Sequence, residues 1–131
     1  MSKLVLDSSA VLAALQKESG GDQVLSRLDE AAISAVNFAE VVSKLGRTGG
    51  DLSQVLSDLH DLVPDIRPFD DEQALAAGLL DSKTRDLGLS LGDRACLTLA
   101  KILGVPAVTA DQAWAKLDIG VSVVLIRGNP S

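Results

Sequence analysis

The chain has 131 residues, of which 47% are hydrophobic and 23% charged, so it can form one substantial core and is neither disordered nor fibrous. Its formal net charge of −6 argues against a protein that reads DNA through a broadly basic surface. One cysteine excludes an internal disulfide. No signal peptide or membrane-spanning run is recognisable, so we expect a cytoplasmic protein.

The first half of the chain predicts strands that alternate with helices. Short apolar runs indicate strands, whereas apolar residues at helical spacing indicate amphipathic helices. Ser8 or Ser9 is expected to cap the first helix, and Asn37 is expected to open the third. In chain order, the predicted elements are a strand over 3–6, a helix over 10–15, a helix over 22–28, a strand over 31–34, a helix from Asn37 to about Gly46 and a helix over 51–62.

The second half continues the same alternation. Its predicted elements are a strand over 66–69, a long helix from 70 to about 85, a helix over 90–103, a strand over 107–109, a short helix over 112–117 and a strand over 121–126. Strands that alternate with helices indicate an α/β fold with a mostly parallel sheet and helices on both faces. We expect a single domain over residues 1–131, because no internal repeat or long linker interrupts the pattern.

Four acidic residues lie where an apolar stretch gives way to the start of a predicted helix. They are Asp7, Glu40, Asp93 and Asp111. A parallel α/β fold gathers such positions at one edge of its sheet, where ligand sites of these folds lie. Carboxylate oxygens are the ligands that Mg²⁺ and Mn²⁺ prefer. A divalent-metal site is therefore one interpretation of these acids.

Helix capping is the other interpretation of the same residues. Asn37 and Glu40 have the spacing of a capping box, as have Ser90 and Asp93, and Asp111 suits an N-cap. Acids in first helical turns also interact favourably with the helix dipole. Other predicted helix starts carry acids as well, so position alone does not select these four.

A family resemblance does select them. Four segments occur in order along nearly the whole chain, and together they resemble the PIN-domain nucleases, most closely the VapC-type toxins of bacterial toxin–antitoxin pairs. Each segment alone is a weak signal, whereas all four in order are specific. The segments are VLDSS at 5–9, ISAVNFAEV at 33–41, LSLGDRACLTLA at 89–100 and VTADQAW at 108–114.

The resemblance implies a fold, an activity and partners. The fold would be a three-layer α/β/α sandwich around a central, mostly parallel sheet. The activity would be Mg²⁺- or Mn²⁺-dependent hydrolysis of RNA phosphodiester bonds by an endoribonuclease toxin. The implied partners are the RNA substrate, a second copy of the chain in a homodimer, and a VapB-type antitoxin whose basic segment would suit the charge of −6.

The resemblance also assigns the site residues. The catalytic and metal-site positions are Asp7, Glu40, Asp93 and Asp111; the supporting positions are Ser9, Thr109 and Asn37. It implies that Asp7 and Asp93 bind metal directly and that the other two acids act partly through water. Asn37 stands where many members have Thr. Arg94, next to Asp93, is expected to support the site by contacting phosphate or a neighbouring acid.

Several residues and readings weigh less. Lys44, Arg47, Lys83 and Arg85 are interpreted first as solvated charges, with RNA contacts as the alternative, and Cys96 is expected to be a buried structural residue. A haloacid-dehalogenase-like phosphatase would need a second Asp where this chain has Ser9. A non-catalytic PIN-like module for assembly or regulation is the remaining alternative, and the four acids argue against it.

Overall fold

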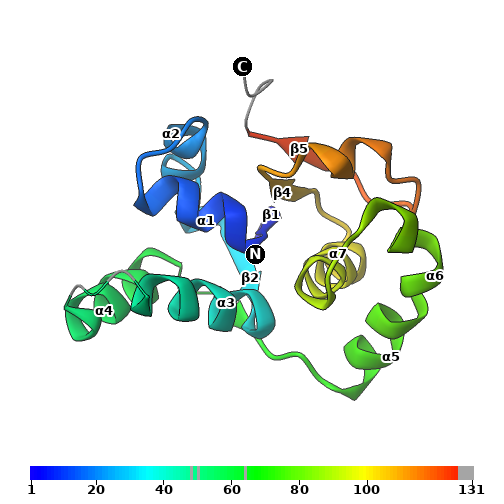
Figure 1. The fold of residues 1–131 in the computed structure, drawn as a ribbon, viewed down its shortest axis with the longest axis horizontal. Helices are drawn as coiled ribbons and strands as arrows, with labels where there is room; N and C mark the ends of the chain where they lie inside the picture. Colours follow the sequence, from blue (N-terminus) through cyan, green and yellow to red (C-terminus); the bar gives the residue numbers. More distant parts are fainter. Residues whose placement is uncertain (48, 50, 64, 127–131) are drawn as a thin grey trace.

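A five-stranded parallel sheet forms the centre of the fold (Figure 1). The computed structural model describes residues 1–47, 49, 51–63 and 65–126, and the sheet order is β3-β2-β1-β4-β5. All its neighbouring strands pair in parallel, as the alternation of strands and helices predicts. The strands are β1 (Leu4–Leu6), β2 (Ala31–Ser34), β3 (Asp65–Arg67), β4 (Ala107–Thr109) and β5 (Val123–Leu125).

Helices cover both faces of this sheet. In Figure 1, α1 to α4 lie on one side of the strands and α5 to α7 on the other, which confirms the expected three-layer α/β/α sandwich. The helices are α1 (Ser8–Leu15), α2 (Gly21–Leu25), α3 (Ala35–Gly46), α4 (Leu52–Leu62), α5 (Asp71–Leu79), α6 (Asp81–Thr84) and α7 (Leu91–Leu103), with 3-10 turns η1 (Leu28–Glu30), η2 (Arg85–Leu87) and η3 (Gln112–Lys116). No helix in the described part of the chain has the length and apolar character needed to cross a membrane.

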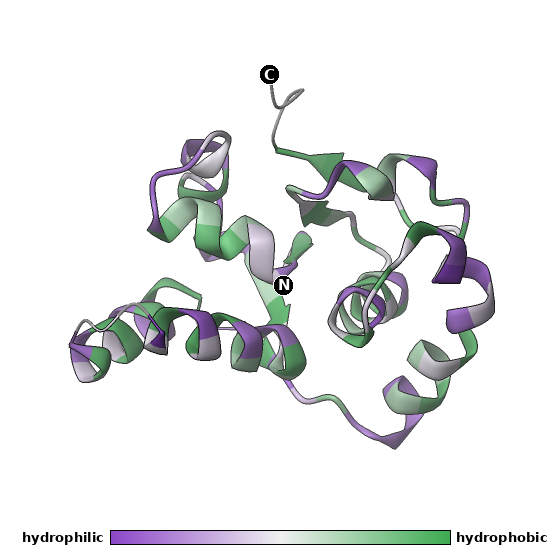
Figure 2. Cartoon of the chain, in the orientation of Figure 1, coloured by the Kyte–Doolittle hydropathy of each residue, from purple (hydrophilic) through white to green (hydrophobic). Residues whose placement is uncertain are grey.

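The sheet separates two apolar cores. Leu4 and Leu6 of β1 pack into the core beneath α1, α3 and α4, whereas Val5 points to the opposite face and packs with α7 and Trp114. Successive strand residues face opposite sides, so a strand covered on both sides is apolar throughout. The strands are accordingly coloured mostly hydrophobic in Figure 2, while the helices show both apolar and polar faces.

Strand register aligns the carboxyl ends of the central strands. Leu6 pairs with Ile33 on β2 and with Val108 on β4. The chain therefore leaves β1, β2 and β4 at the same edge of the sheet, where Asp7 and Thr109 lie. This edge is where parallel α/β folds place ligand sites.

The first helix begins earlier than expected. Asp7, and not Ser8 or Ser9, caps α1, because its carboxylate accepts a 2.9 Å hydrogen bond from the backbone N–H of Ala10. A charged carboxylate oxygen is a stronger acceptor than a hydroxyl. Strand β1 ends immediately before Asp7. One acid therefore both ends the strand and caps the helix.

The helix that carries Glu40 also begins earlier. Ser34 caps α3 by accepting a 3.2 Å hydrogen bond from the backbone N–H of Val36. The expectation that Asn37 opens the helix is therefore wrong. Asn37 lies inside the first turn and is buried, where its side chain is available for tertiary contacts.

The long helix expected from 70 to about 85 is broken. The chain turns at Leu80 and continues as the short α6 and the 3-10 turn η2. Leu80 and Thr84 are both buried, and the Thr84 hydroxyl donates a 2.9 Å hydrogen bond to the Leu80 carbonyl. Such back-bonding bends helices.

Two other expected helices also differ. The helix expected over 22–28 divides into α2 and η1, and the helix expected over 112–117 is the 3-10 turn η3.

Candidate active site

Asp7 is the most buried acid at the carboxyl edge of the sheet. The residue is 3% exposed, and three donors hold its carboxylate. One carboxylate oxygen accepts from the Ser9 hydroxyl at 2.7 Å and from the Ala10 N–H at 2.9 Å, and the other accepts from the Thr109 hydroxyl at 2.8 Å. Burial raises the pKa of Asp7 to about 6, against the lowering effect of these hydrogen bonds, and the charge of Asp93 raises it further.

Ser9 and Thr109 connect Asp7 to the loop that follows β4. The Ser9 hydroxyl accepts a 3.0 Å hydrogen bond from the N–H of Ala110, and the Thr109 hydroxyl accepts one of the same length from the N–H of Asp111. The two hydroxyls lie 3.3 Å apart. Both residues thus contact Asp7 and fix the backbone that carries Asp111.

Glu40 is held against the first turn of α7. The Asn37 amide donates 3.0 Å hydrogen bonds to the Glu40 carboxylate and to the Gly92 carbonyl, so this buried side chain joins α3 to α7. A Cβ atom at Gly92 would lie 2.4–2.6 Å from the Glu40 carboxylate, a separation that real contacts do not reach. The absence of a side chain at Gly92 therefore leaves the space that Glu40 occupies, next to Asp93.

Asp93 takes part in a capping box at the start of α7. Its carboxylate accepts a 2.8 Å hydrogen bond from the Ser90 N–H, and the Ser90 hydroxyl accepts one of 3.2 Å from the Asp93 N–H. Burial is the main cause that raises the pKa of Asp93; the bonds from Ser90 lower it, and the charges of Asp111 and Glu40 raise it. Asp93 therefore takes part in capping α7, as the capping interpretation predicts, and it also lies close enough to Asp111 and Glu40 for their charges to affect it.

Asp111 is the exposed member of the group. It caps η3 by accepting a 3.0 Å hydrogen bond from the Ala113 N–H. The charge of Asp111 raises the pKa of Asp93, and the charge of Asp93 raises the pKa of Asp7.

The buried Cys96 thiol lies close to the same acids. Burial raises its pKa well above the usual value, and the charges of Asp7, Asp93 and Glu40 raise it further. The structure therefore brings the four predicted acids into one region.

The four carboxylates suit a hard divalent cation by their chemistry. They supply oxygen donors, and the pKa of Asp7 and of Asp93 is raised partly by neighbouring acids, an electrostatic penalty that a cation would relieve. Within the described ranges, no three His, Cys, Asp or Glu side chains converge into a ready-made metal-binding group. The donor set thus fits a metal such as Mg²⁺ or Mn²⁺, and the carboxylates would have to draw together around it.

Arg94 lies apart from this group of interactions. Its guanidinium donates a 3.0 Å hydrogen bond to the Ala77 carbonyl on α5 and lies 4.0 Å from the Asp81 carboxylate. The neighbouring acid that Arg94 contacts is thus Asp81, and no acid of the site acts as its partner among the described ion pairs.

Sequence reasoning missed Gly92 as part of the site. A glycine in the first turn of a long helix has poor helix propensity, and this cost was the available signal that another group approaches the backbone there. The partner could not be read from the sequence, because Glu40 comes from a different helix.

Comparison with known proteins decides the family. A model of the PIN domain matches residues 4–120. This chain belongs to the PIN domain family. PIN domains are generally nucleases that use divalent metals, which supports a hydrolase that acts on nucleic acid. A comparison with curated proteins found no match.

Solved structures share the fold of this PIN domain. A toxin–antitoxin complex from Klebsiella pneumoniae matches at 17% identity with a TM-score of 0.72, covering 95% of this chain and 98% of the other. DNA-bound VapBC from Salmonella typhimurium matches at 15% identity and 0.71, covering 96% and 99%. VapBC-5 from Mycobacterium tuberculosis matches at 26% identity and 0.63, covering 98% and 100%. These similarities are consistent with a VapC-type PIN nuclease, as the sequence motifs predict.

Proposed function

We propose that this PIN domain is a metal-dependent endoribonuclease and the toxin of a VapBC-type toxin–antitoxin pair. The observation that carries the proposal is the gathering of Asp7, Glu40, Asp93 and Asp111 at the carboxyl edge of a parallel sheet, in a chain of this family. The similarity to VapBC complexes supports the toxin assignment.

Each acid has a role that its position supports. Asp7 and Asp93 would hold Mg²⁺ or Mn²⁺ directly, with Asp7 oriented by Ser9 and Thr109. When bound, the cation would supply Lewis acidity toward water and neutralise charge on the phosphate. Glu40 is half-buried and lines a groove open to solvent, so it can meet the substrate. Asp111 is exposed at the same edge and would complete the site through water.

The hydrogen bonds around Asp7 prepare it for this role. Three donors fix the orientation of both oxygens, so the other acids would have to move toward Asp7 when a cation binds. Asn37 does the same for Glu40 by holding it against α7. Both supporting contacts come from residues that the sequence motifs predict.

Two protein partners belong to the proposal. The first is a VapB-type antitoxin with a basic segment, which the net charge of −6 and the acid group support. The second is another copy of the chain. Leu75, Leu79 and Leu91 on α5 and α7 expose more than half of their surface, and a homodimer interface would cover such residues. Light scattering of the purified protein, alone and co-expressed with the product of a neighbouring gene, tests both partners.

Cleavage of total cellular RNA tests the activity. The purified protein is incubated with Mg²⁺, with Mn²⁺ and with EDTA, beside Asp7→Asn and a matched control, Asp71→Asn, which removes an exposed acid from the first turn of α5. We expect discrete, metal-dependent fragments from the wild type and Asp71→Asn, and none from Asp7→Asn. Absence of cleavage by folded, antitoxin-free protein with either metal would favour the non-catalytic alternative.

A further inference from the structure

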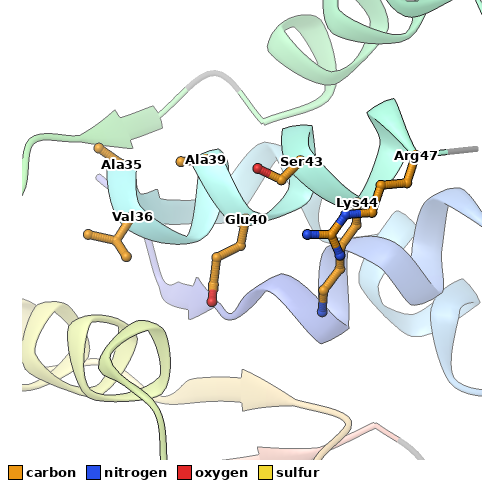
Figure 3. A pocket seen from close by; sticks show the side chains of 7 residues that line it. All are labelled: Ala35, Val36, Ala39, Glu40, Ser43, Lys44 and Arg47. Carbon is orange, nitrogen blue, oxygen red and sulfur yellow. The ribbon is translucent and has the colours of Figure 1, made fainter.

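A groove runs along α3 beside Glu40. Its volume is about 660 Å³, and Figure 3 shows the side chains that line it. The end near Glu40 is formed by small or apolar side chains, and the far end carries two cations. The lining residues are Ala35, Val36, Ala39, Glu40, Ser43, Lys44 and Arg47. The groove therefore connects an acid of the candidate active site to positive charge.

The charged residues of the groove follow one face of the helix. Lys44 and Arg47 are four and seven residues after Glu40, which places all three on the same side of α3. At 1.5 Å per residue, Lys44 lies about 6 Å and Arg47 about 10 Å along the helix axis from Glu40. In Figure 3 the three side chains project from the same side of α3. A strand that passes the acids would meet the cations next.

Both cations lack an acidic partner among the described ion pairs. The described ion pairs place a cation within 4.0 Å of a carboxylate, and they involve Arg27, Arg67, Arg85 and Arg94. None of them includes Lys44 or Arg47. Glu40 has the favourable spacing for an ion pair with Lys44, but its carboxylate is instead bound by Asn37. In a chain with a net charge of −6, these two exposed cations remain available to an anionic ligand.

We propose that Lys44 and Arg47 bind phosphates of the RNA strand next to the scissile one and thereby position that strand on the acid group. This inference rests on the proposed ribonuclease function and names a positioning surface for it. The guanidinium of Arg47 can bind a phosphate in a bidentate manner, and Lys44 supplies a point charge. Ala35 and Ala39 leave room beside the backbone for ribose or base.

A second groove provides the matched control. Lys83 and Lys101 border a cavity of about 340 Å³ between α5, α6 and α7, together with Leu79 and Ile102. These lysines are also exposed, but none of the four site acids lines their cavity. If RNA were attracted by any exposed cation, the two pairs would contribute equally. If RNA is positioned along α3, only Lys44 and Arg47 contribute.

Binding of a fluorescein-labelled 12-nucleotide single-stranded RNA of mixed sequence, followed by anisotropy, tests the proposal. The Asp7→Asn background prevents cleavage during the titration. The logarithm of the association constant is measured against the logarithm of salt concentration. We expect Lys44→Ala and Arg47→Ala each to weaken binding and to reduce the salt slope by about 0.7. Lys44→Arg should retain binding, and Lys83→Ala and Lys101→Ala should match the background.

Kinetics in the otherwise wild-type protein separate this inference from the activity itself. Loss of positioning should raise KM in Lys44→Ala and Arg47→Ala while kcat is retained, because phosphates away from the reacting bond are bound equally in the ground and transition states. Cleavage with unchanged KM and salt slope in both variants would overturn the inference alone and leave the proposed function standing. If the wild type does not cleave RNA, but Lys44→Ala and Arg47→Ala still weaken binding in the Asp7→Asn background, the proposed function is overturned and the RNA-binding surface stands.

Discussion

The Thr109 hydroxyl donates a 2.8 Å hydrogen bond to Asp7 and accepts a 3.0 Å hydrogen bond from the backbone N–H of Asp111. One side chain at the end of β4 thus joins an acid that follows β1 to an acid that follows β4. The contact exists because Leu6 and Val108 are paired in the parallel sheet, which places the next residues of the two strands side by side. The geometry of the acid group therefore depends on strand register as well as on the acids.

Thr109→Val should destabilise the protein, whereas Thr98→Val should not. Both threonines are buried, but the Thr98 hydroxyl has no hydrogen-bond partner among the described residues. Removing the Thr109 hydroxyl leaves Asp7 without one donor, so we expect the free energy of unfolding to fall by about 1–3 kcal/mol. Thr98→Val should change it by less than about 0.5 kcal/mol or raise it. Urea unfolding at pH 7 measures both, and equal losses would contradict the role given to the Thr109 hydroxyl.

Asp7→Asn should reveal a pH-dependent cost of the buried carboxylate. The pKa of Asp7 is raised to about 6 in the folded, metal-free protein, whereas an unfolded Asp has a pKa near 3.9. Between these values the folded state binds more protons than the unfolded state, so Asp7 makes the protein less stable as pH rises from about 4 to about 6. Above that window the full penalty, at most about 3 kcal/mol, is present.

Unfolding of wild type and Asp7→Asn in EDTA at pH 4 and pH 7.5 measures this cost. The stability of Asp7→Asn relative to wild type should increase by about 1–3 kcal/mol from the lower to the higher pH. Asn can still accept from the Ala10 N–H, so the cap of α1 is retained in the variant. A difference between the two proteins that stays constant over this pH range would show that Asp7 is ionised with an ordinary pKa.

Divalent metal should stabilise the wild type and fail to stabilise Asp93→Asn to the same degree. A cation that binds only the folded state at ten times its dissociation constant adds about 1.4 kcal/mol, which corresponds to a rise in Tm of about 3–6 °C for a domain of this size. Asn can replace Asp93 as acceptor of the Ser90 N–H, so the capping box is largely kept. Differential scanning fluorimetry with Mg²⁺, Mn²⁺ and EDTA at pH 7.5 measures the shift.

The control for the metal experiment is Asp71→Asn, an exposed acid in the first turn of α5. It changes the net charge by the same amount as Asp93→Asn, so it corrects for non-specific screening by the added salt. An identical metal-induced shift in all three proteins would mean that the cations act on the general charge of the chain. The assignment of Asp93 as a metal ligand would then be wrong.

The sequence predicted the parts of the fold that depend on local pattern. The strands at 31–34 and 107–109 match the observed bounds, because both are short apolar runs and a run of this length favours a strand over a helix. The start of α3 was missed, because Ser34 and Asn37 can both cap a helix and only tertiary burial of Asn37 decides between them. The break at Leu80 depends on which face of the chain packs on α7, which no local pattern records.

The acids of the site were selected by family motifs, and their mutual contacts were not predictable from them. Asp7, Asp93 and Asp111 all cap helices or turns, so the capping and metal-site interpretations are compatible in the same residues. The contact of Glu40 with Gly92 arises only when α3 packs against α7. The motifs contain both residues, but their proximity is a property of the packed helices.

Gly92→Ala should strongly reduce activity with little loss of stability. The added Cβ would meet the Glu40 carboxylate at 2.4–2.6 Å, so Glu40 must leave its position and its hydrogen bond to Asn37. Gly92 has no left-handed backbone requirement, and alanine favours helices over glycine by about 1 kcal/mol, which offsets part of the cost. We therefore expect a cleavage rate reduced by roughly a hundredfold, with an unchanged circular dichroism spectrum.

Gly78→Ala in α5 is the matched control for this helix substitution. Nothing lies within 4 Å of the Cβ that it adds, so the variant should be slightly more stable than the wild type and fully active. A second substitution, Glu40→Gln in the Gly92→Ala background, tests the cause. Because Glu40 is already displaced, this change should reduce cleavage much less than it does in the wild type. Fully additive losses would show that Gly92→Ala acts through some other part of the site.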